Sequence, residues 1–218
     1  MLALVFVLAA AAAPPAPADG VYTYTVNVGG AQAGKTTIRL THAPAGIQLT
    51  ESASANFNGA DFAANATMRL DANLAPTSYT AVYNAPAKTV HAALAVNGNS
   101  ASETSDTGNT TFPLAANTKN YAVLDGTLFA GFFMLPAQLR AWNAQAVTAV
   151  SPMFGRAPAL AIDAALKPDR PKDVPAADSA ISVSDPVAFT LWYDPSTLVV
   201  DELVVPDQDA TYARVRTP

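Results

Sequence analysis

Apolar and polar residues alternate along much of the first half of the chain. Residues 21–28 read Val-Tyr-Thr-Tyr-Thr-Val-Asn-Val, which places Tyr22, Tyr24, Val26 and Val28 on one face and polar residues on the other. A period of two is typical of a half-buried β-strand. The same alternation recurs in residues 35–41, 47–57, 62–70, 78–83 and 88–96. These runs predict six strands.

Short turn sequences separate the alternating runs. They include Gly29-Gly30, Ala43-Pro44-Ala45-Gly46, Asn58-Gly59, Ala75-Pro76 and Asn97-Gly98. Glycine, proline and asparagine favour tight turns, whereas parallel strands need crossovers of about a dozen residues or more. The strands should therefore form an antiparallel meander.

The period changes between residues 125 and 146. Large apolar side chains recur there at helical spacing, at Leu128, Phe129, Phe132, Phe133, Leu135, Leu139 and Trp142. Asp125 or Thr127 is placed to cap the start of such a helix. Because proline lacks a backbone N–H, Pro136 predicts a kink or two short helices, with Pro136 in the first turn of the second.

The remaining segments extend the β pattern. We expect a hairpin end plus a loop in residues 97–120 and a solvated, proline-rich loop in residues 167–180. Further strands are expected near residues 147–151, 159–166, 188–193, 198–205 and 211–216. The spacing predicts a mainly β fold with an antiparallel sheet of roughly nine to eleven strands and one or two short helices. Residues 19–218 should form a single domain.

Residues 1–18 have the features of a signal peptide. An uncharged apolar run, Met1 to Ala13, precedes Ala16-Pro17-Ala18, which offers small residues for cleavage before Asp19. The run is shorter than the ~20 residues that span a bilayer as a helix. It lacks a lysine or arginine, and a retained membrane anchor is the alternative. We expect a periplasmic or secreted protein without a transmembrane segment after cleavage.

Composition excludes several classes of function. Charged residues make up 13% of the chain, the net charge is −5, and no basic cluster is present, so nucleic-acid binding is disfavoured. The absence of cysteine excludes disulfides, thiolate catalysis and cysteine-ligated zinc. Alanine is abundant, with 47 residues, and many occupy alternate strand positions. Such small side chains have to pack against something bulky.

Residues Gly29 to Thr36 match the phosphate-loop pattern G-x-x-x-x-G-K-[ST]. A phosphate loop requires a helix after the lysine and threonine, because helix amides bind the phosphates. Here residues 36–41 alternate at period two instead. We expect a hairpin turn with Lys35 facing water, and nucleotide binding is a remote alternative.

Other candidate chemistry is sparse. His42 and His91 are far apart and have no acidic residue beside them in sequence, so surface positions are expected. Asp201 and Glu202 are adjacent on a predicted strand and point to opposite faces. Asp207-Gln208-Asp209 begins like a calcium loop but lacks its glycine and later glutamate. We therefore predict no catalytic residue, no metal site, no cofactor and no enzymatic activity.

Three segments together resemble a group of exported bacterial domains. They are Tyr22-Thr23-Tyr24-Thr25-Val26 with the glycines at 29, 30 and 34, Leu124-Asp125-Gly126 with the phenylalanines that follow, and Leu191-Trp192-Tyr193-Asp194-Pro195. The pattern looks like uncharacterised periplasmic proteins and is similar in outline to the lipoprotein carriers LolA and LolB. The resemblance implies a half-barrel, a curved antiparallel sheet wrapped around the helical segment. Its concave face would hold an acyl chain or another apolar ligand, although no arginine maps onto the carriers' lipid-handling position.

Two functions follow as hypotheses. In the first, an exported protein binds an apolar or lipid ligand on the concave face, where Ala53, Ala55, Ala64, Ala66 and Ala92 leave space; close packing of helix on sheet would fill that space instead. The candidate ligand-binding residues are Tyr22, Tyr24, Phe129, Phe132, Phe133, Leu139 and Trp142. In the second, the domain is an envelope scaffold or adaptor that engages a protein partner and takes no small-molecule ligand.

Overall fold

A computed structural model describes residues 14–216, apart from residues 58, 98–99, 107, 114–120, 152–154, 164–165, 167 and 186. Most of the predicted signal peptide, residues 1–13, lies outside the described residues. The short segment before the first strand is attached to the domain, since Pro17 is buried and the Tyr22 hydroxyl donates to the Ala18 carbonyl at 2.7 Å.

Twelve strands form one continuous antiparallel sheet that does not close. Its order is β12-β13-β14-β15-β1-β2-β3-β4-β5-β6-β7-β8. The first eight strands are β1 (Gly20–Val28), β2 (Ala31–Ala43), β3 (Gly46–Phe57), β4 (Ala60–Leu70), β5 (Pro76–Ala85), β6 (Lys88–Asn97), β7 (Ser100–Ser105) and β8 (Gly108–Pro113). The C-terminal strands are β12 (Ser179–Val183), β13 (Phe189–Tyr193), β14 (Val200–Val205) and β15 (Ala210–Arg214), with a short 3-10 helix, η1 (Pro206–Gln208), before the last.

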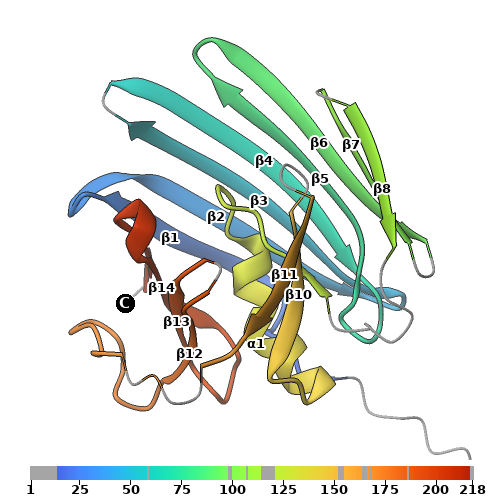
Figure 1. Ribbon diagram of the computed structural model, residues 1–218. Helices are drawn as coiled ribbons and strands as arrows, with labels where there is room; N and C mark the ends of the chain where they lie inside the picture. Colours follow the sequence, from blue (N-terminus) through green and yellow to red (C-terminus); the bar gives the residue numbers. More distant parts are fainter. Residues whose placement is uncertain are drawn as a thin grey trace, which may run out of the picture.

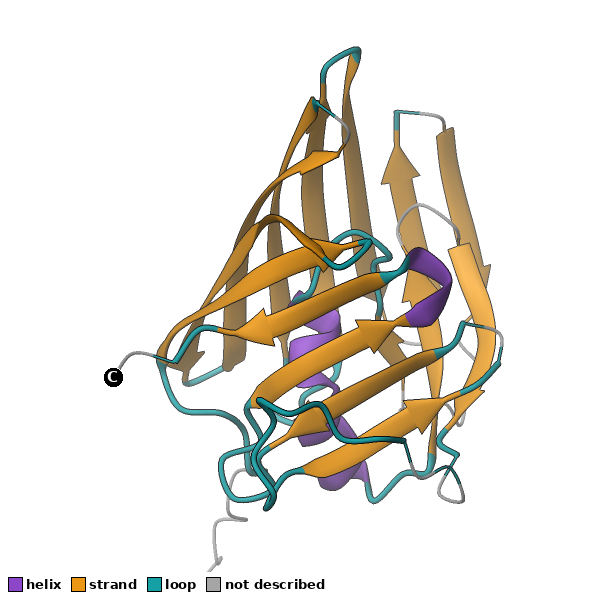
Figure 2. Ribbon diagram, turned by 90° about the vertical axis from the view of Figure 1, so that its left-hand side faces the viewer, coloured by secondary structure: helices purple, strands orange, loops and turns teal. Residues whose placement is uncertain are grey.

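The long strands curve around α1 (Ala130–Trp142), the single α-helix of the described residues (Figure 1). Viewed from the side, α1 lies between the long strands and the C-terminal strands, which face each other across it (Figure 2). Every residue of α1 from Ala130 to Leu139 is buried. The helix therefore fills the middle of the concave face.

A second, small sheet has the order β11-β10-β9 and consists of β9 (Tyr121–Val123), β10 (Ala146–Ser151) and β11 (Gly155–Ala161). β9 and β10 run parallel, and α1 is the crossover between them. Gly131 lets the helix approach β9, because a Cβ atom there would lie 1.7 Å from the Val123 carbonyl oxygen. No helix in the described part of the chain is long and apolar enough to cross a membrane.

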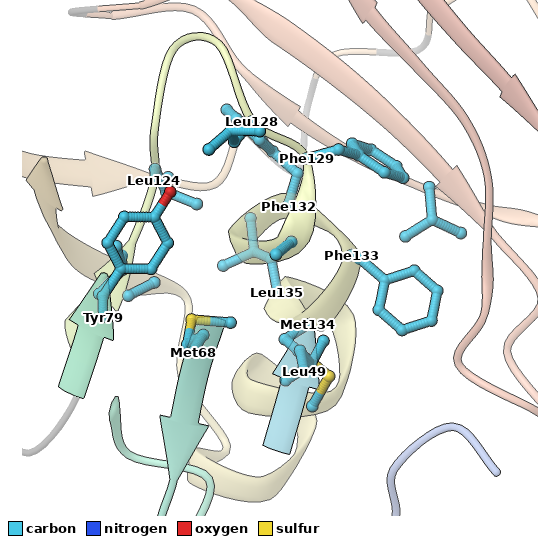
Figure 3. Close-up of a cluster of buried hydrophobic side chains, with 14 of the residues drawn as sticks. Leu49, Met68, Tyr79, Leu124, Leu128, Phe129, Phe132, Phe133, Met134 and Leu135 are labelled. Atoms are coloured by element: carbon cyan, nitrogen blue, oxygen red, sulfur yellow. The ribbon is translucent and has the colours of Figure 1, made fainter. Parts of the chain in front are cut away.

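The inward positions of the alternating strands form the core. Leu49 of β3 and Met68 of β4 point toward Met134 and Leu135 of α1 (Figure 3). Among the inward alanines, Ala64, Ala66 and Ala92 are buried, and Ala53 and Ala55 are half-buried. Close packing around the helix thus accounts for much of the alanine in the strands.

The predicted mainly β fold with a curved antiparallel sheet around a helical segment is confirmed. The sheet has twelve strands, more than the nine to eleven expected, because residues 100–113 form a full hairpin and β12 begins inside the segment expected to be loop. The short strand β9 was not predicted either. The segment before β12 is not fully solvated, since Val174 and Asp178 are buried and Arg170 lies over the Trp192 ring at 5.2 Å.

Of the two alternatives predicted at Pro136, two short helices is wrong, and a kink stays a prediction. One helix runs from Ala130 to Trp142 with Pro136 inside it. The proline removes the bond that residue 136 would donate to the Phe132 carbonyl, yet burial of the surrounding turns holds the helix together.

Phe133 provides a test of this packing. Its side chain is fully buried, so Phe133→Ala should lower the free energy of unfolding by about 3–5 kcal/mol, as large-to-small core substitutions do. Trp142→Ala should cost less, because Trp142 is only half-buried. Urea unfolding monitored by circular dichroism measures both. A loss below about 1 kcal/mol for Phe133→Ala would show that α1 does not fill the concave face.

Candidate ligand-binding site on the concave face

A buried carboxylate on the sheet fixes the start of the helix. Glu51 occupies an inward position of β3 and is 3% exposed. It accepts hydrogen bonds from the backbone N–H of Phe129 at 2.8 Å, from that of Ala130 at 2.7 Å and from the Thr36 hydroxyl at 2.7 Å. Helix N-termini carry unpaired amides and a partial positive charge. Glu51 accepts hydrogen bonds from the amides, and its acidic group complements the charge. The expected capping by Asp125 or Thr127 is therefore wrong, since the cap comes from a strand 78 residues away.

Burial raises the pKa of Glu51 from 4.5 to about 7. The hydrogen bonds from Phe129, Thr36 and Ala130 oppose this rise, and the nearby charge of Asp125 adds to it. The side chain thus lies near its midpoint of titration at neutral pH.

Asp125 organises the turn that leads into the helix. Its carboxylate accepts hydrogen bonds from the Tyr79 hydroxyl at 3.0 Å, from the Tyr83 hydroxyl, and from the Thr127 N–H and hydroxyl at 3.0 and 2.8 Å. Burial and the charge of Asp125 raise the pKa values of Tyr79 and Tyr83, so both hydroxyls stay protonated and donate. Two inward carboxylates therefore tie the 125–130 segment to strands β3 and β5.

Aromatic side chains gather beside this anchor. Tyr24 lies 4.5 Å from Phe129 and 6.4 Å from Phe133 between ring centroids, and Tyr212 stacks on Phe129 at 5.3 Å. The Tyr24 hydroxyl donates to the Val200 carbonyl at 2.7 Å. Tyr22 lies 4.9 Å from Phe133 and is half-buried. Burial raises the pKa of Tyr212 to about 12, and the charges of Glu51 and Asp125 contribute to the rise.

The structure thus brings Tyr22, Tyr24, Phe129 and Phe133 together as one packed cluster. The other three predicted ligand-binding residues lie elsewhere. The ring centroid of Phe132 lies 5.3 Å from that of Phe189, and Leu139 lies near the C-terminal end of α1. The Trp142 indole N–H donates to the Asn73 carbonyl at 2.8 Å. Of the seven, Phe132 and Leu139 line the cavities described next.

A cavity of about 300 Å³ lies at the N-terminal end of α1, and we call it the N-end cavity. Its apolar walls come from β1, β4 and β15, through Val26, Val28, Phe62, Ala210 and Tyr212. An enclosed pocket of about 30 Å³ adjoins it and shares Gly126, Gln208 and Tyr212 as lining residues. This pocket also borders Asp125, so the anchored turn forms one wall of both spaces.

A second cavity, of about 560 Å³, lies at the opposite end of α1. We call it the C-end cavity. It is bounded by the last turn of the helix, by Ile162, by the edge strand β12 and by its neighbour β13. Because α1 fills the middle of the concave face, the two cavities are separate.

Gly29 to Thr36 forms the β1–β2 hairpin, with Gly29 and Gly30 at φ values of +59° and +74°. A strand follows where a phosphate loop has a helix, and Thr36 is buried and bonded to Glu51. Lys35 is exposed and borders a hollow of about 920 Å³ between the hairpin ends of β2–β5, which Asp61 also lines. This geometry does not provide the amides that hold a phosphate.

The two histidines are exposed, as expected, but each has an acidic neighbour that the sequence did not indicate. His42 Nδ1 lies 2.5 Å from Asp19 Oδ1, and His91 Nδ1 lies 3.4 Å from Asp106 Oδ2. The hydrogen bonds from the histidines lower the pKa values of both aspartates. These pairs fix strand ends at the surface.

Acidic groups also meet at the C-terminal strands. Asp201 is buried and pairs with Arg214 Nη1 and Arg216 Nη2, both at 3.2 Å. Burial and the charge of Asp201 raise the pKa of the nearby Asp178 to about 6. Across the described ranges of the chain, the acidic and histidine side chains form no cluster suited to a metal ion.

The pKa of Glu51 makes stability depend on pH in a way that Glu51→Gln should remove. In the unfolded chain, Glu51 loses its proton near pH 4.5. In the folded protein it keeps the proton up to about pH 7. The stabilisation from protonated Glu51 is therefore complete below pH 4.5 and is lost as the pH rises through about 7. Relative to Glu51→Gln, the wild-type protein should lose up to about 3 kcal/mol of unfolding free energy over this range.

Urea unfolding at several pH values measures this difference. Asp61→Asn, at an exposed position, is the control and should follow the wild-type pH dependence. Parallel pH profiles for wild type and Glu51→Gln would contradict the assignment of a raised pKa to Glu51.

Comparison with known proteins shows the fold. No protein-family model and no curated protein sequence matches the chain. The structure is similar to that of a DUF1089 family protein from Pseudomonas aeruginosa, with a TM-score of 0.50 and 11% identity over 94% of this chain and 98% of that one. It is also similar to a β-barrel-like protein of the domain of unknown function DUF1849 from Brucella abortus, with a TM-score of 0.51 and 8% identity over 89% and 93% of the two chains. The chain thus has the fold of β-barrel-like proteins of unknown function, and these comparisons do not show the expected likeness to LolA and LolB.

Proposed function

We propose that this protein is an exported, non-enzymatic binder of an apolar ligand, and that the ligand enters the N-end cavity. The observation that carries the proposal is a space of about 300 Å³ with walls that are largely aliphatic and aromatic. This volume is at the lower end of the range of about 300–1,000 Å³ typical of small-molecule sites. An apolar ligand gains free energy there by leaving water.

The surroundings of the N-end cavity support binding rather than chemistry. Asp125, which borders the adjoining pocket, accepts four hydrogen bonds from Tyr79, Tyr83 and Thr127. A carboxylate held in this way positions the wall of the cavity, which supports binding. Half-buried Phe62 and Tyr212 contribute aromatic surface to its walls.

The signal-like residues 1–18 support export, which would place the protein in the periplasm or outside the cell. In that setting, an acyl chain is the apolar ligand that the resemblance to the LolA and LolB carriers implies. The ligand would lie at the end of the helix, because the centre of the concave face is occupied by Phe129 and Phe133.

Gly126→Trp tests the site. Gly126 is exposed and lines the cavity, and a Cβ atom there would have only Gln208 Nε2 at 4.0 Å, so a large side chain can be added without a backbone clash. Titration with the neutral fluorescent probe N-phenyl-1-naphthylamine should show an affinity for Gly126→Trp that is lower by about tenfold or more. Ala45→Trp, in the exposed β2–β3 turn, is the matched control and should bind like the wild type. Equal affinity for both variants would overturn the N-end cavity as the site.

An envelope scaffold or adaptor is the second candidate function. The sheet is open, and its edge strands β8 and β12 each pair with one neighbour in the described structure. The edge strand of an open sheet can accept a strand from a partner where its backbone groups are free. A wild-type protein that takes up no neutral probe would favour this function.

A further inference from the structure

The C-end cavity differs from the N-end cavity in its charge. Its walls include Leu139, Ile162, Ile181 and Leu198, of which Ile181 and Leu198 are 5% and 2% exposed. Arg140, in the last turn of α1, is the charged residue among those that line it. A single cation therefore stands beside an apolar surface, in a chain whose net charge is −5.

Arg140 is held in place and keeps donors to spare. Its Nη1 donates to the Pro195 carbonyl at 2.9 Å, which fixes the guanidinium at the rim between α1 and the β13–β14 turn. A guanidinium has five N–H donors in a planar fork, and the fork matches a carboxylate. Among the described residues the remaining donors have no hydrogen-bond partner, so they are available to an anion.

The end of the helix does not oppose an anion strongly. Carbonyl groups at a helix C-terminus carry partial negative charge. Here the Arg140 carbonyl accepts from the Asn143 N–H at 3.3 Å, and the Leu139 carbonyl accepts from the Ala144 N–H at 3.0 Å. Asn143 adopts the left-handed conformation that allows this closure.

We propose that the C-end cavity binds a single-chain carboxylate, a free fatty acid, with the carboxylate on Arg140 and the hydrocarbon chain along Leu139, Ile162 and Ile181. The volume of about 560 Å³ lies within the range of single small-molecule sites, which favours one chain over a two-chain lipid. The site and its ligand class are distinct from those proposed for the N-end cavity, so each proposal stands or fails by itself.

Calorimetric titration with dodecanoate and with its uncharged analogue dodecanol tests the proposal. Arg140→Gln should weaken dodecanoate binding by about tenfold or more and leave dodecanol binding within about twofold, because only the carboxylate pairs with the guanidinium. Arg140→Lys should restore part of the affinity for dodecanoate. Arg39→Gln, at an exposed position of β2, is the matched control and should change neither.

Ala180→Trp tests the location of the ligand in the C-end cavity without changing Arg140. Ala180 is exposed on β12 and lines the cavity, so a tryptophan there should block dodecanoate while the strand pairing is retained. Gly126→Trp should leave dodecanoate binding unchanged. Loss of dodecanoate binding in Gly126→Trp alone, or equal losses of both ligands in Arg140→Gln, would overturn the proposal.

Discussion

The hydrogen bonds from the helix N-terminus to Glu51 hold the arrangement together. They join the first amides of α1 to an inward position of the sheet, and so they set where the helix lies on the concave face. A buried carboxylate without such partners would be costly, because removing its charge from water carries a large penalty. Here amides and the Thr36 hydroxyl replace part of that water and lower the pKa of Glu51, although burial outweighs them and the pKa remains raised.

The position of the helix determines where the proposed ligands would bind. With its N-terminus on Glu51 and Asp125 holding the preceding turn, α1 places Phe129 and Phe133 against Tyr24 and fills the centre of the concave face. Two cavities lie beyond the ends of the helix, one at each end. One of these spaces is bordered by a bonded carboxylate and the other by a guanidinium, so the two suit ligands of different charge.

Sequence periodicity predicted most of this fold, because strands and the helix bury faces whose spacing can be read directly. Two patterns were sufficient to predict a sheet with a helix packed on it. They are the alternation in residues 21–28 and 47–57 and the spacing of Phe129, Phe132 and Phe133. Glu51 was missed, although it is the charged residue at an inward position between Leu49 and Ala53, and that break in the apolar pattern is the signal that could have found it. The partners of Glu51, His42 and His91 depend on contacts between distant segments, which periodicity does not encode.

Native mass spectrometry of protein purified from a host that exports it tests the central claim most directly. If α1 is fixed on Glu51 and leaves an apolar cavity for a ligand, part of the population should carry a bound apolar molecule, and that mass should be reduced in Gly126→Trp but not in Ala45→Trp. A spectrum containing only the bare chain, or an adduct that Gly126→Trp retains in full, would contradict a ligand-binding role for the N-end cavity.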